Sequence, residues 1–443
     1  MQLTLWARLL HLVPTVLWRT VVHKPLTPDE LRRLQNKKLR ALIKHIYAHV
    51  PYYSSLFRKA GLHPDDIQTV DDLSKIPVTR KTDLRDRPVE DVLASNIAMD
   101  QCKVTRTSGT TGIPLTVYWE RKARLISRLL YFRSFLEWGY DVTHKMVNLG
   151  TASLVPKEHW LQKIGLFRSK WISPFIDVTT QVDEIMAYDP SVLYSYPTLL
   201  EELCKEIIDE DVRGLDIRRV FSSGEHLDDP TRALIHKALD AEVFEGYGCR
   251  EAGGITAECV QHQGGHTYAE ANIVEITRNG ETLSVGETGE VTVTNLNNRA
   301  MPFIRYDLED IGVLLGGECP CGNSAPLIRL TEGRTKDRIP LPDGRRIPAT
   351  VPIEVLRYVP GLRQFQVIQE ARDRIVVQII PGRAMAKTAP DAIREQLRPI
   401  LGDVKIEVRE VDHIPREKSG KLRQFISHVS TTRYKTHNGL QHS

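Results

Sequence analysis

Apolar and polar positions follow two different periods along this chain. Leucine and isoleucine recur at helical spacing over residues 27–50, behind the capping box Thr27-Pro28-Asp29-Glu30, and Pro51 is expected to end this helix. Between about residues 121 and 245, short apolar runs alternate with amphipathic segments. This alternation of strand-like and helix-like patterns predicts an α/β fold with a mainly parallel sheet.

The elements expected in and around this alternating region can be given by residue range. Strands are expected at 145–152, 191–197 and 218–224, and helices at 121–139, 198–209 and 230–239. Before them, residues 101–120 have the pattern of strand, loop and strand. After them, over about 268–316, the pattern indicates a β-rich section in which Asn279-Gly280 marks a hairpin turn.

A boundary between two domains is expected near residues 333–348, which are rich in glycine, proline and charge. We therefore predict a large domain over 1–336 and a small domain over 337–443. The small domain has the pattern of an α+β unit, whose size is normal for an independent domain. Its expected elements are two strands within 364–381, a helix over 391–402 that ends at Gly402, and a strand over 404–412.

Composition and charge restrict the class of protein further. With 41% hydrophobic residues, and 60 basic against 56 acidic side chains, the chain has the composition of a folded protein. Its net charge of +4 does not favour nucleic acid as a partner. Six cysteines are too few for a disulfide scaffold, so a reducing compartment, the cytoplasm, is expected.

The first twenty residues are apolar, but Arg8, His11 and Pro14 interrupt them, and no apolar run in the chain reaches 18 residues. We therefore expect neither a membrane-spanning helix nor a secretory signal. An amphipathic helix over residues 1–20 is expected to pack on its own protein or on another subunit. Peripheral contact with a membrane is the less favoured alternative, and a homodimer is left open.

The sharpest local signal is the loop Thr107-Ser108-Gly109-Thr110-Thr111-Gly112. Its two glycines permit a tight turn, and its hydroxyls and backbone N–H groups can surround phosphate oxygens. It lacks the Gly-Lys-Ser/Thr ending of the mononucleotide P-loop. Taken alone, the loop is as consistent with an ordinary hairpin turn as with phosphate binding.

Further polar motifs follow this loop in a fixed order. They are Ser222-Ser223-Gly224-Glu225, Glu245-Gly246-Tyr247-Gly248-Cys249-Arg250-Glu251, Arg305-Tyr306-Asp307-Leu308-Glu309-Asp310, Gly333-Arg334-Thr335-Lys336-Asp337 and Pro415-Arg416-Glu417-Lys418-Ser419-Gly420-Lys421. The first two close predicted strands, where α/β sheets place their ligand-binding loops. The ordered set resembles the adenylate-forming superfamily of acyl-CoA synthetases and covers residues 30–425. The N-terminal run over 39–85, the shortness of the chain and the Cys/His pattern described below narrow the resemblance to the phenylacetate–coenzyme A ligase branch and its capsule-biosynthesis-type relatives.

The resemblance implies a large ATP- and acyl-binding domain and a small C-terminal lid domain. It also implies that the chain activates a carboxylic acid with ATP and Mg²⁺, and then passes the acyl group to coenzyme A. The implied ligands of the ATP phosphates are Ser108, Gly109, Thr110, Thr111 and Gly112; those of the nucleoside are Gly224, Glu225, Tyr247, Asp310 and Arg334. By the same resemblance Glu251 binds Mg²⁺, Asp337 lies at the hinge, and Lys421 is the catalytic lysine of the lid.

Some of these assignments have alternatives. The family usually has threonine where Arg250 stands, and we expect the Arg250 guanidinium to act electrostatically beside the α-phosphate. Asp307 is the second candidate for the ribose after Asp310. Lys418 is the second candidate for the catalytic lysine after Lys421.

A second group of residues has the composition of a metal site. Cys259, His262 and His266 are followed later by Cys319-Pro320-Cys321, and three thiolates with one imidazole satisfy tetrahedral Zn²⁺. We prefer a closed structural zinc site to free thiols. Related ligases with a Cys…His…Cys-x-Cys pattern favour His266 over His262. Cys204, on an amphipathic segment, is expected in the core.

The sequence does not specify the acid. Either the segment Asn148-Leu149-Gly150-Thr151 or the residues Tyr194, Tyr196 and Pro197 are expected to line the acyl site. An amide-forming ligase that transfers the acyl group to an amine, in polysaccharide or secondary-metabolite assembly, is the alternative to a coenzyme A ligase. A non-catalytic nucleotide-binding scaffold is the second alternative, against which the presence of Glu251 and Lys421 argues.

Overall fold

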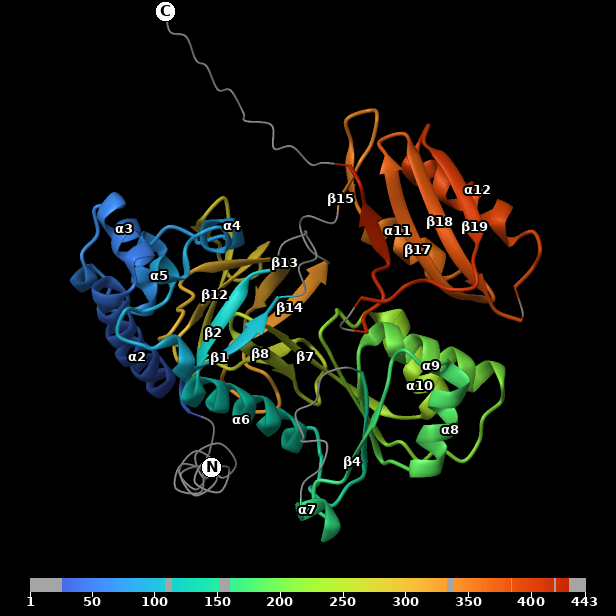
Figure 1. The fold of residues 1–443 in the computed structure, drawn as a ribbon, viewed down its shortest axis with the longest axis horizontal. Coiled ribbons are helices and arrows are strands. Elements are labelled where there is room, and N and C mark those ends of the chain that lie inside the picture. The colour runs from blue at the N-terminus through green and yellow to red at the C-terminus, as the bar shows by residue number, and fades with distance from the viewer. Residues whose placement is uncertain are drawn as a thin grey trace, which may run out of the picture. The chain divides into compact units, whose positions relative to one another are not determined.

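The computed structural model of this 443-residue chain describes residues 26–107, 114–150, 160–332, 338–383, 385–417 and 420–429. The chain divides into two compact units, Met1–Arg334 and Thr335–Ser443 (Figure 1). In the part of the chain that the structure describes, no helix is long and apolar enough to cross a membrane. The expected amphipathic helix over residues 1–20 lies outside the described residues.

The first unit begins with two helices, α2 (Pro28–His49) and α3 (Pro51–Lys59). The predicted capping box is confirmed, because Thr27 Oγ1 accepts a hydrogen bond from the Glu30 backbone N–H and Glu30 Oε2 accepts one from the Thr27 N–H. Pro51 does more than end α2, since it is also the first residue of α3. Short helical turns follow: η1 (Pro64–Asp66), η2 (Val70–Lys75), α4 (Lys81–Arg85), α5 (Val89–Val92) and η3 (Met99–Gln101).

A hairpin and a long helix come next in the first unit. The predicted strand–loop–strand segment forms the antiparallel pair of β1 (Cys102–Arg106) and β2 (Thr116–Glu120). Helix α6 (Arg121–Glu137) follows without a break. It packs along β8, and its buried residues are Ala123, Leu130, Ser134 and Phe135.

The region predicted from alternating patterns forms parallel strands in the spatial order β7, β6, β5, β3, β4. These are β3 (Met146–Leu149), β4 (Ser169–Ile172), β5 (Val192–Ser195), β6 (Arg219–Ser223) and β7 (Glu242–Cys249). The expected helices are present as α6, α9 (Pro197–Asp209) and α10 (Asp229–Leu239). The sequence prediction missed β4, which is only partly buried at the edge of the sheet, and with it α7 (Trp160–Lys163) and α8 (Val178–Tyr188).

Alternation along the strands separates two apolar cores. Met146 and Val192 face α6, whereas Val147 and Leu193, their immediate neighbours, face α8, α9 and α10. Figure 1 shows these three helices grouped together in green. Because both faces of the parallel strands are covered, their runs are continuously apolar, as the sequence pattern indicated.

The parallel strands continue into an antiparallel section of the same sheet. The order beyond β7 is β8 (Gly253–Glu258), β9 (Gly265–Thr267), β14 (Leu327–Glu332), β13 (Tyr306–Leu315), β12 (Thr288–Asn295), β10 (Asn272–Arg278) and β11 (Glu281–Thr282). The description "mainly parallel" therefore holds for β3 to β7 only, and the sheet as a whole is mixed. The reversal occurs at β8, because three residues separate it from β7, and a parallel crossover needs a dozen or more.

The predicted Asn279-Gly280 turn is confirmed. It joins β10 to β11, with Arg278 paired to Glu281, and both turn residues have positive φ angles of 56° and 92°. Such angles are those of a two-residue type I′ hairpin, for which asparagine followed by glycine is the preferred sequence.

The second unit is a small α+β structure with a sheet in the order β19, β18, β17, β20. The elements predicted for it are present as β17 (Leu362–Ala371), β18 (Arg374–Pro381), α12 (Ala389–Leu401) and β19 (Lys405–Glu410). Gly402 follows α12 with a φ of 68°, as expected of a residue that ends a helix. The prediction missed β15 (Arg338–Pro340), β16 (Arg346–Pro348), α11 (Thr350–Arg357) and β20 (Phe425–Ser427).

Candidate active site

Two polar side chains from strands far apart in sequence meet beyond the end of the parallel strands. The Tyr247 hydroxyl, near the end of β7, donates a 2.6 Å hydrogen bond to Asp310 Oδ2 on β13. Both residues were assigned to the nucleoside from their motifs. The structure brings them together, although neither motif contains information on the other's position.

Glu251 lies in the turn between β7 and β8, and its carboxylate is buried. The Tyr306 hydroxyl, at the start of β13, donates a 3.1 Å hydrogen bond to Glu251 Oε1. The two carboxylates of Glu251 and Asp310 are therefore each held by a tyrosine hydroxyl that links β13 to the end of β7. Sequence reasoning did not single out Tyr306, since nothing in its motif indicates a partner.

The start of β13 is anchored by a buried arginine. The Arg305 guanidinium is 1% exposed and forms a 3.2 Å ion pair with Glu275 on β10. It also donates to the backbone carbonyls of Ser74 and Ile76, which precede the β-bridge between Thr79 and Tyr306. A buried guanidinium is tolerated only when its donors are paired in this way, so these bonds hold Tyr306 in register with the N-terminal segment.

Arg250 has an exposed side chain, and its backbone carbonyl accepts a 3.0 Å hydrogen bond from Trp119 Nε1. The Arg124 guanidinium of α6 lies 5.9 Å from the centre of the same tryptophan ring. Desolvation lowers the pKa of Arg124, and repulsion from Arg128 and Arg250 lowers it further. The turn before Glu251 is thus a region of positive potential that suits an anionic ligand.

The motif at the end of β6 turns sharply. Gly224 has a φ of 87°, which a side chain would disfavour. The Glu225 carboxylate that follows accepts hydrogen bonds from the Thr198 backbone N–H, at 3.1 Å, and from Thr198 Oγ1, at 2.8 Å. Because Thr198 lies in the first turn of α9, this carboxylate stabilises the positive end of that helix.

Asp307, the second candidate for the ribose, has a different environment from Asp310. Its backbone N–H donates to the Thr79 carbonyl, and its Oδ1 accepts a bond from the Glu309 N–H. Burial raises its pKa to about 6, with repulsion from Glu290 and Glu309 adding to the effect. Asp307 is therefore partly protonated near neutral pH, whereas the neighbouring motif residue Asp310 is bonded to Tyr247.

Several predicted site residues cannot be placed. Ser108, Gly109, Thr110, Thr111, Gly112, Arg334 and Asp337 lie outside the described residues, as does Lys418. Lys421 is described and lies in the second unit. Its carbonyl accepts a 2.9 Å hydrogen bond from the Glu417 N–H.

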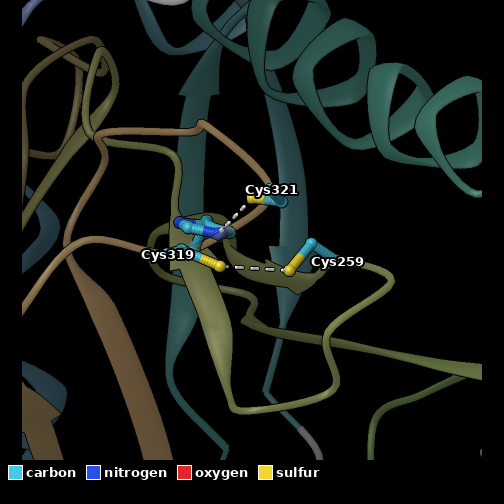
Figure 2. Close-up of side chains that lie close together, drawn as sticks. Cys259, Cys319 and Cys321 are labelled. Atoms are coloured by element: carbon cyan, nitrogen blue, oxygen red, sulfur yellow. Dashed lines mark hydrogen bonds between the residues drawn. The ribbon is translucent and has the colours of Figure 1, made fainter.

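Four side chains predicted to bind metal come together at a second place in the first unit. Cys259 follows β8, His266 lies in β9, and Cys319 and Cys321 lie in the connection between β13 and β14. Their ligand atoms all lie within 4.8 Å of one another. The Sγ atoms of Cys259 and Cys319 are 3.6 Å apart, and Cys321 Sγ is 3.2 Å from His266 Nε2. Figure 2 shows the three labelled cysteines converging on one point.

The surroundings of these four side chains orient them. His266 Nδ1 lies 3.0 Å from the Ala325 carbonyl, to which it can donate, and this leaves Nε2 with a lone pair toward the thiols. The Asn323 N–H donates to Cys321 Sγ, and Gly322, with a φ of 81°, closes the turn by donating to the Cys319 carbonyl. His262 instead faces Glu258, at 3.3 Å. The donor set therefore fits a closed tetrahedral zinc site built with His266.

The remaining cysteines have separate surroundings. Cys204 is fully buried in the core formed with α8, α9 and α10, as predicted. Cys102 is buried beside the Ala98 carbonyl, and Cys249 Sγ accepts a hydrogen bond from the Ala252 N–H.

Comparisons with known proteins agree with the fold. The family model described as the CapK C-terminal domain matches residues 341–428. The phenylacetate-coenzyme A ligase of Thermus thermophilus is 25% identical over 430 residues, covering 90% of this chain and 96% of the relative. The phenylacetate-coenzyme A ligase of Escherichia coli is 29% identical over 348 residues, covering 74% of this chain and 77% of the relative.

Solved structures share the fold at lower identity. A 2-hydroxyisobutyryl-CoA ligase in the postadenylation state matches with a TM-score of 0.74 and 19% identity, covering 92% of this chain and 91% of that one. ATP-bound MatB from Rhodopseudomonas palustris matches with a TM-score of 0.52 and 16% identity, covering 74% of this chain and 68% of that one.

Proposed function

This chain belongs to the adenylate-forming superfamily, in its phenylacetate–coenzyme A ligase-like branch, and we propose that it is an ATP-dependent, AMP-forming acid–thiol ligase. The observation that carries the proposal is the meeting of Tyr247, Asp310 and Glu251 at the end of β7. An aromatic ring, a carboxylate for hydroxyls and a buried carboxylate for a cation are what a nucleoside polyphosphate requires.

In the proposed site, the nucleoside of ATP lies between the end of β6 and β13. Tyr247 stacks on the adenine, and its hydrogen bond fixes the Asp310 carboxylate so that it can accept from the ribose hydroxyls. Gly224 and Glu225 form the adenine-side turn. The loop Ser108–Gly112 and Arg334 are proposed to hold the phosphates and to assist at the ribose, on the strength of the motifs.

The first half-reaction transfers AMP to the acid. A carboxylate oxygen of the substrate attacks the α-phosphorus, and the bond from that phosphorus to the pyrophosphate oxygen breaks, which gives acyl-AMP and pyrophosphate. Negative charge grows on the α-phosphate oxygens in the transition state. Arg250, in the positively charged turn, and Lys421, on the second unit, are proposed to stabilise that charge.

The second half-reaction forms the thioester. The coenzyme A sulfur attacks the acyl carbonyl, the thiol proton is lost, and AMP leaves with the bonding electrons of the acyl–oxygen bond. An amine acceptor would give an amide by the same displacement. We place coenzyme A first because the relatives that span most of this chain are named as coenzyme A ligases.

Two metals are proposed. Mg²⁺ is usually held by one or two carboxylates together with substrate phosphates, and the Glu251 carboxylate fits that role, neutralising phosphate charge when the ion is bound. Zn²⁺ is proposed for Cys259, His266, Cys319 and Cys321, where it would tie β8 and β9 to the loop between β13 and β14. We place the protein in the cytoplasm, where such thiols stay reduced.

The test is pyrophosphate release from ATP over a panel of carboxylic acids, measured with and without coenzyme A and with simple amines. Acid-dependent release followed by thioester formation with coenzyme A is the expected result. Amide formation without a thioester would assign the acceptor to the amine class. Nucleotide binding without pyrophosphate release for any acid would leave only the non-catalytic alternative.

A further inference from the structure

The N-terminal half of α6 carries arginines beside the turn between β7 and β8. The Arg124 guanidinium carbon lies 5.9 Å from the centre of the Trp119 ring. Trp119 Nε1 in turn donates a 3.0 Å hydrogen bond to the Arg250 carbonyl in that turn. Arg128 follows Arg124 by four residues, so the two lie on the same side of the helix. We call Arg124, Arg128 and Arg250 the arginine group.

Close packing of α6 on β8 fixes the position of the arginine group. Figure 1 shows α6 beside β8, with which it is in contact. A Cβ atom at Gly253 would overlap Ser127 Oγ, three residues after Arg124, so glycine lets the helix lie directly on the strand. Gly253 is two residues after Glu251, the proposed ligand of Mg²⁺. The arginine group therefore lies beside the proposed site of the ATP phosphates.

No acidic side chain compensates the charge of Arg124. Burial lowers its pKa, and repulsion from Arg128 and Arg250 lowers the pKa further. Among the described residues Arg124 forms no ion pair. The first turn of α6 contains Arg121 and Lys122 and no acidic residue, and cations at this end of a helix oppose its dipole. These effects are unfavourable in the free protein and are relieved when an anion binds.

The chemistry of the arginine group suits an oxyanion. A guanidinium presents paired N–H donors that match two oxygens of a carboxylate or a phosphate. Trp119 is fully buried and holds Arg124 partly out of water, which strengthens the attraction between the guanidinium and an anion. Arg128 and Arg250 are exposed, so a ligand can reach the group from solvent.

We propose that Arg124 and Arg128, together with Arg250, form a binding site for an oxyanion. The inference rests on the proposed function, in which two anions have this chemistry. One is the pyrophosphate part of ATP, and the other is a second acidic group on the carboxylic acid. Neither Arg124 nor Arg128 belongs to the motifs from which the nucleotide site was assigned.

The first part of the test measures binding without catalysis. Inorganic pyrophosphate with Mg²⁺, and separately succinate and glutarate, are titrated calorimetrically into the full-length protein. We expect at least one of these anions to bind, and Arg124→Gln and Arg128→Gln each to weaken that binding by about tenfold or more, because each removes hydrogen bonds from a charged donor. Arg128 is exposed, so its substitution is not expected to affect folding.

The matched control is Lys122→Gln. It removes the same charge from an exposed side chain in the first turn of the same helix. Lys122 is two residues from Arg124, and side chains at that spacing do not lie on the same side of a helix. This variant should keep the wild-type affinity.

Thermal unfolding distinguishes binding from a role in packing. Because Arg124 is repelled by Arg128 and Arg250, Arg124→Gln should keep or raise the Tm of the ligand-free protein while it loses affinity for the anion. A lower Tm with unchanged affinity would mean that Arg124 only holds α6 in place, and would overturn the inference.

The second part of the test identifies the source of the oxyanion. Pyrophosphate release with ATP and Mg²⁺ is compared for succinate and butanoate, and for glutarate and pentanoate, in which a methyl group replaces one carboxyl group. A preference for the dicarboxylic acid that Arg124→Gln abolishes assigns the site to the acid. A rise in KM for ATP that is equal for every acid assigns it to the pyrophosphate part of ATP.

The inference is overturned if the wild-type protein binds none of the three anions, or if both arginine variants bind them as tightly as the wild type. The proposed function is then unaffected, because its own test is pyrophosphate release over the wider panel of acids. If no acid releases pyrophosphate, the proposed function fails, whereas a loss of pyrophosphate affinity in the two variants still supports the oxyanion site.

Discussion

The Tyr247 hydroxyl donates a 2.6 Å hydrogen bond to Asp310 Oδ2, although 63 residues separate the two in the chain. The bond joins the last parallel strand to the antiparallel section of the sheet. It therefore ties the proposed adenine-stacking ring to the proposed ribose ligand, and the role of each residue can be tested by substitution.

Asp310→Asn is expected to raise KM for ATP by roughly tenfold to a hundredfold, because a hydrogen bond to a charged group is worth about 1.5–3 kcal/mol. Tyr247→Phe should raise it less, since the ring remains and only the bond that orients Asp310 is lost. Initial rates of pyrophosphate release at varied ATP measure both. Asp307→Asn is the matched comparison: if it raises KM for ATP while Asp310→Asn does not, the ribose ligand is Asp307.

Lys421→Ala is expected to slow adenylate formation about a hundredfold or more, because an ammonium directed at the α-phosphate stabilises the transition state more than the ground state. Thioester formation from supplied acyl-AMP should be largely retained. ATP–pyrophosphate exchange and a single-turnover thioester assay separate the two steps.

The control for Lys421→Ala is Lys405→Ala, which removes an exposed lysine from β19 in the same unit and should change neither rate. Near-normal exchange in Lys421→Ala would remove its catalytic role and make Lys418 the next residue to substitute.

The zinc site proposed for Cys259, His266, Cys319 and Cys321 predicts about one zinc per chain in protein purified without chelators. Cys321→Ser should lose the zinc and several kcal/mol of folding stability together, because binding free energy at a structural site is folding free energy. Elemental analysis and urea unfolding measure the two effects.

Cys204→Ala is the control for the zinc experiment. It removes a fully buried thiol from an apolar core, and so should cost about 1 kcal/mol or somewhat more while the zinc content stays unchanged. Fresh, unchelated wild-type protein without zinc would contradict the assignment.

Asp307 predicts a pH dependence of stability. Burial raises its pKa to about 6 against the lowering effect of the hydrogen bond from the Glu309 N–H and of Arg80, and repulsion from Glu290 and Glu309 adds to the rise. An unfolded aspartate has a pKa of about 3.9. Between these two values the folded state binds more protons than the unfolded state, so the contribution of Asp307 to stability falls as pH rises from about 4 to about 6. The fall amounts to about 2–3 kcal/mol.

Asp307→Asn should remove this fall, because the amide keeps the oxygen that accepts from Glu309 and cannot ionise. The difference in unfolding free energy between wild type and variant, measured from pH 4 to pH 7, should move in favour of the variant as pH rises. Asp216→Asn is the control, since Asp216 is exposed and its side-chain bond to Arg218 lowers its pKa. It should leave the pH 4–6 decline in place; a decline unchanged in Asp307→Asn would refute the assignment.

Interactions between residues close together in the sequence determined several local features of this structure. The Thr27–Glu30 capping box, the Asn279-Gly280 turn and the glycine that ends α12 each depend on residues within a few positions of one another, so the sequence alone predicts them. The sequence also predicted the parallel strands β3, β5 and β6, because strands that are buried on both faces have continuous apolar runs. The convergence of Cys259, His266, Cys319 and Cys321 was predicted from their chemistry and from the resemblance to related ligases.

Only the tertiary structure decided which distant residues meet. The reversal from parallel to antiparallel pairing at β8 joins the parallel strands and the antiparallel section into one sheet. No local pattern in the sequence indicates which strands become neighbours. The bond from Tyr306 to Glu251, the buried Arg305 and the packing of Ser127 on Gly253 all follow from that arrangement. Long-range pairing depends on the packing of whole elements rather than on the residues beside each position, and for that reason the sequence could name the groups of the site but not their partners.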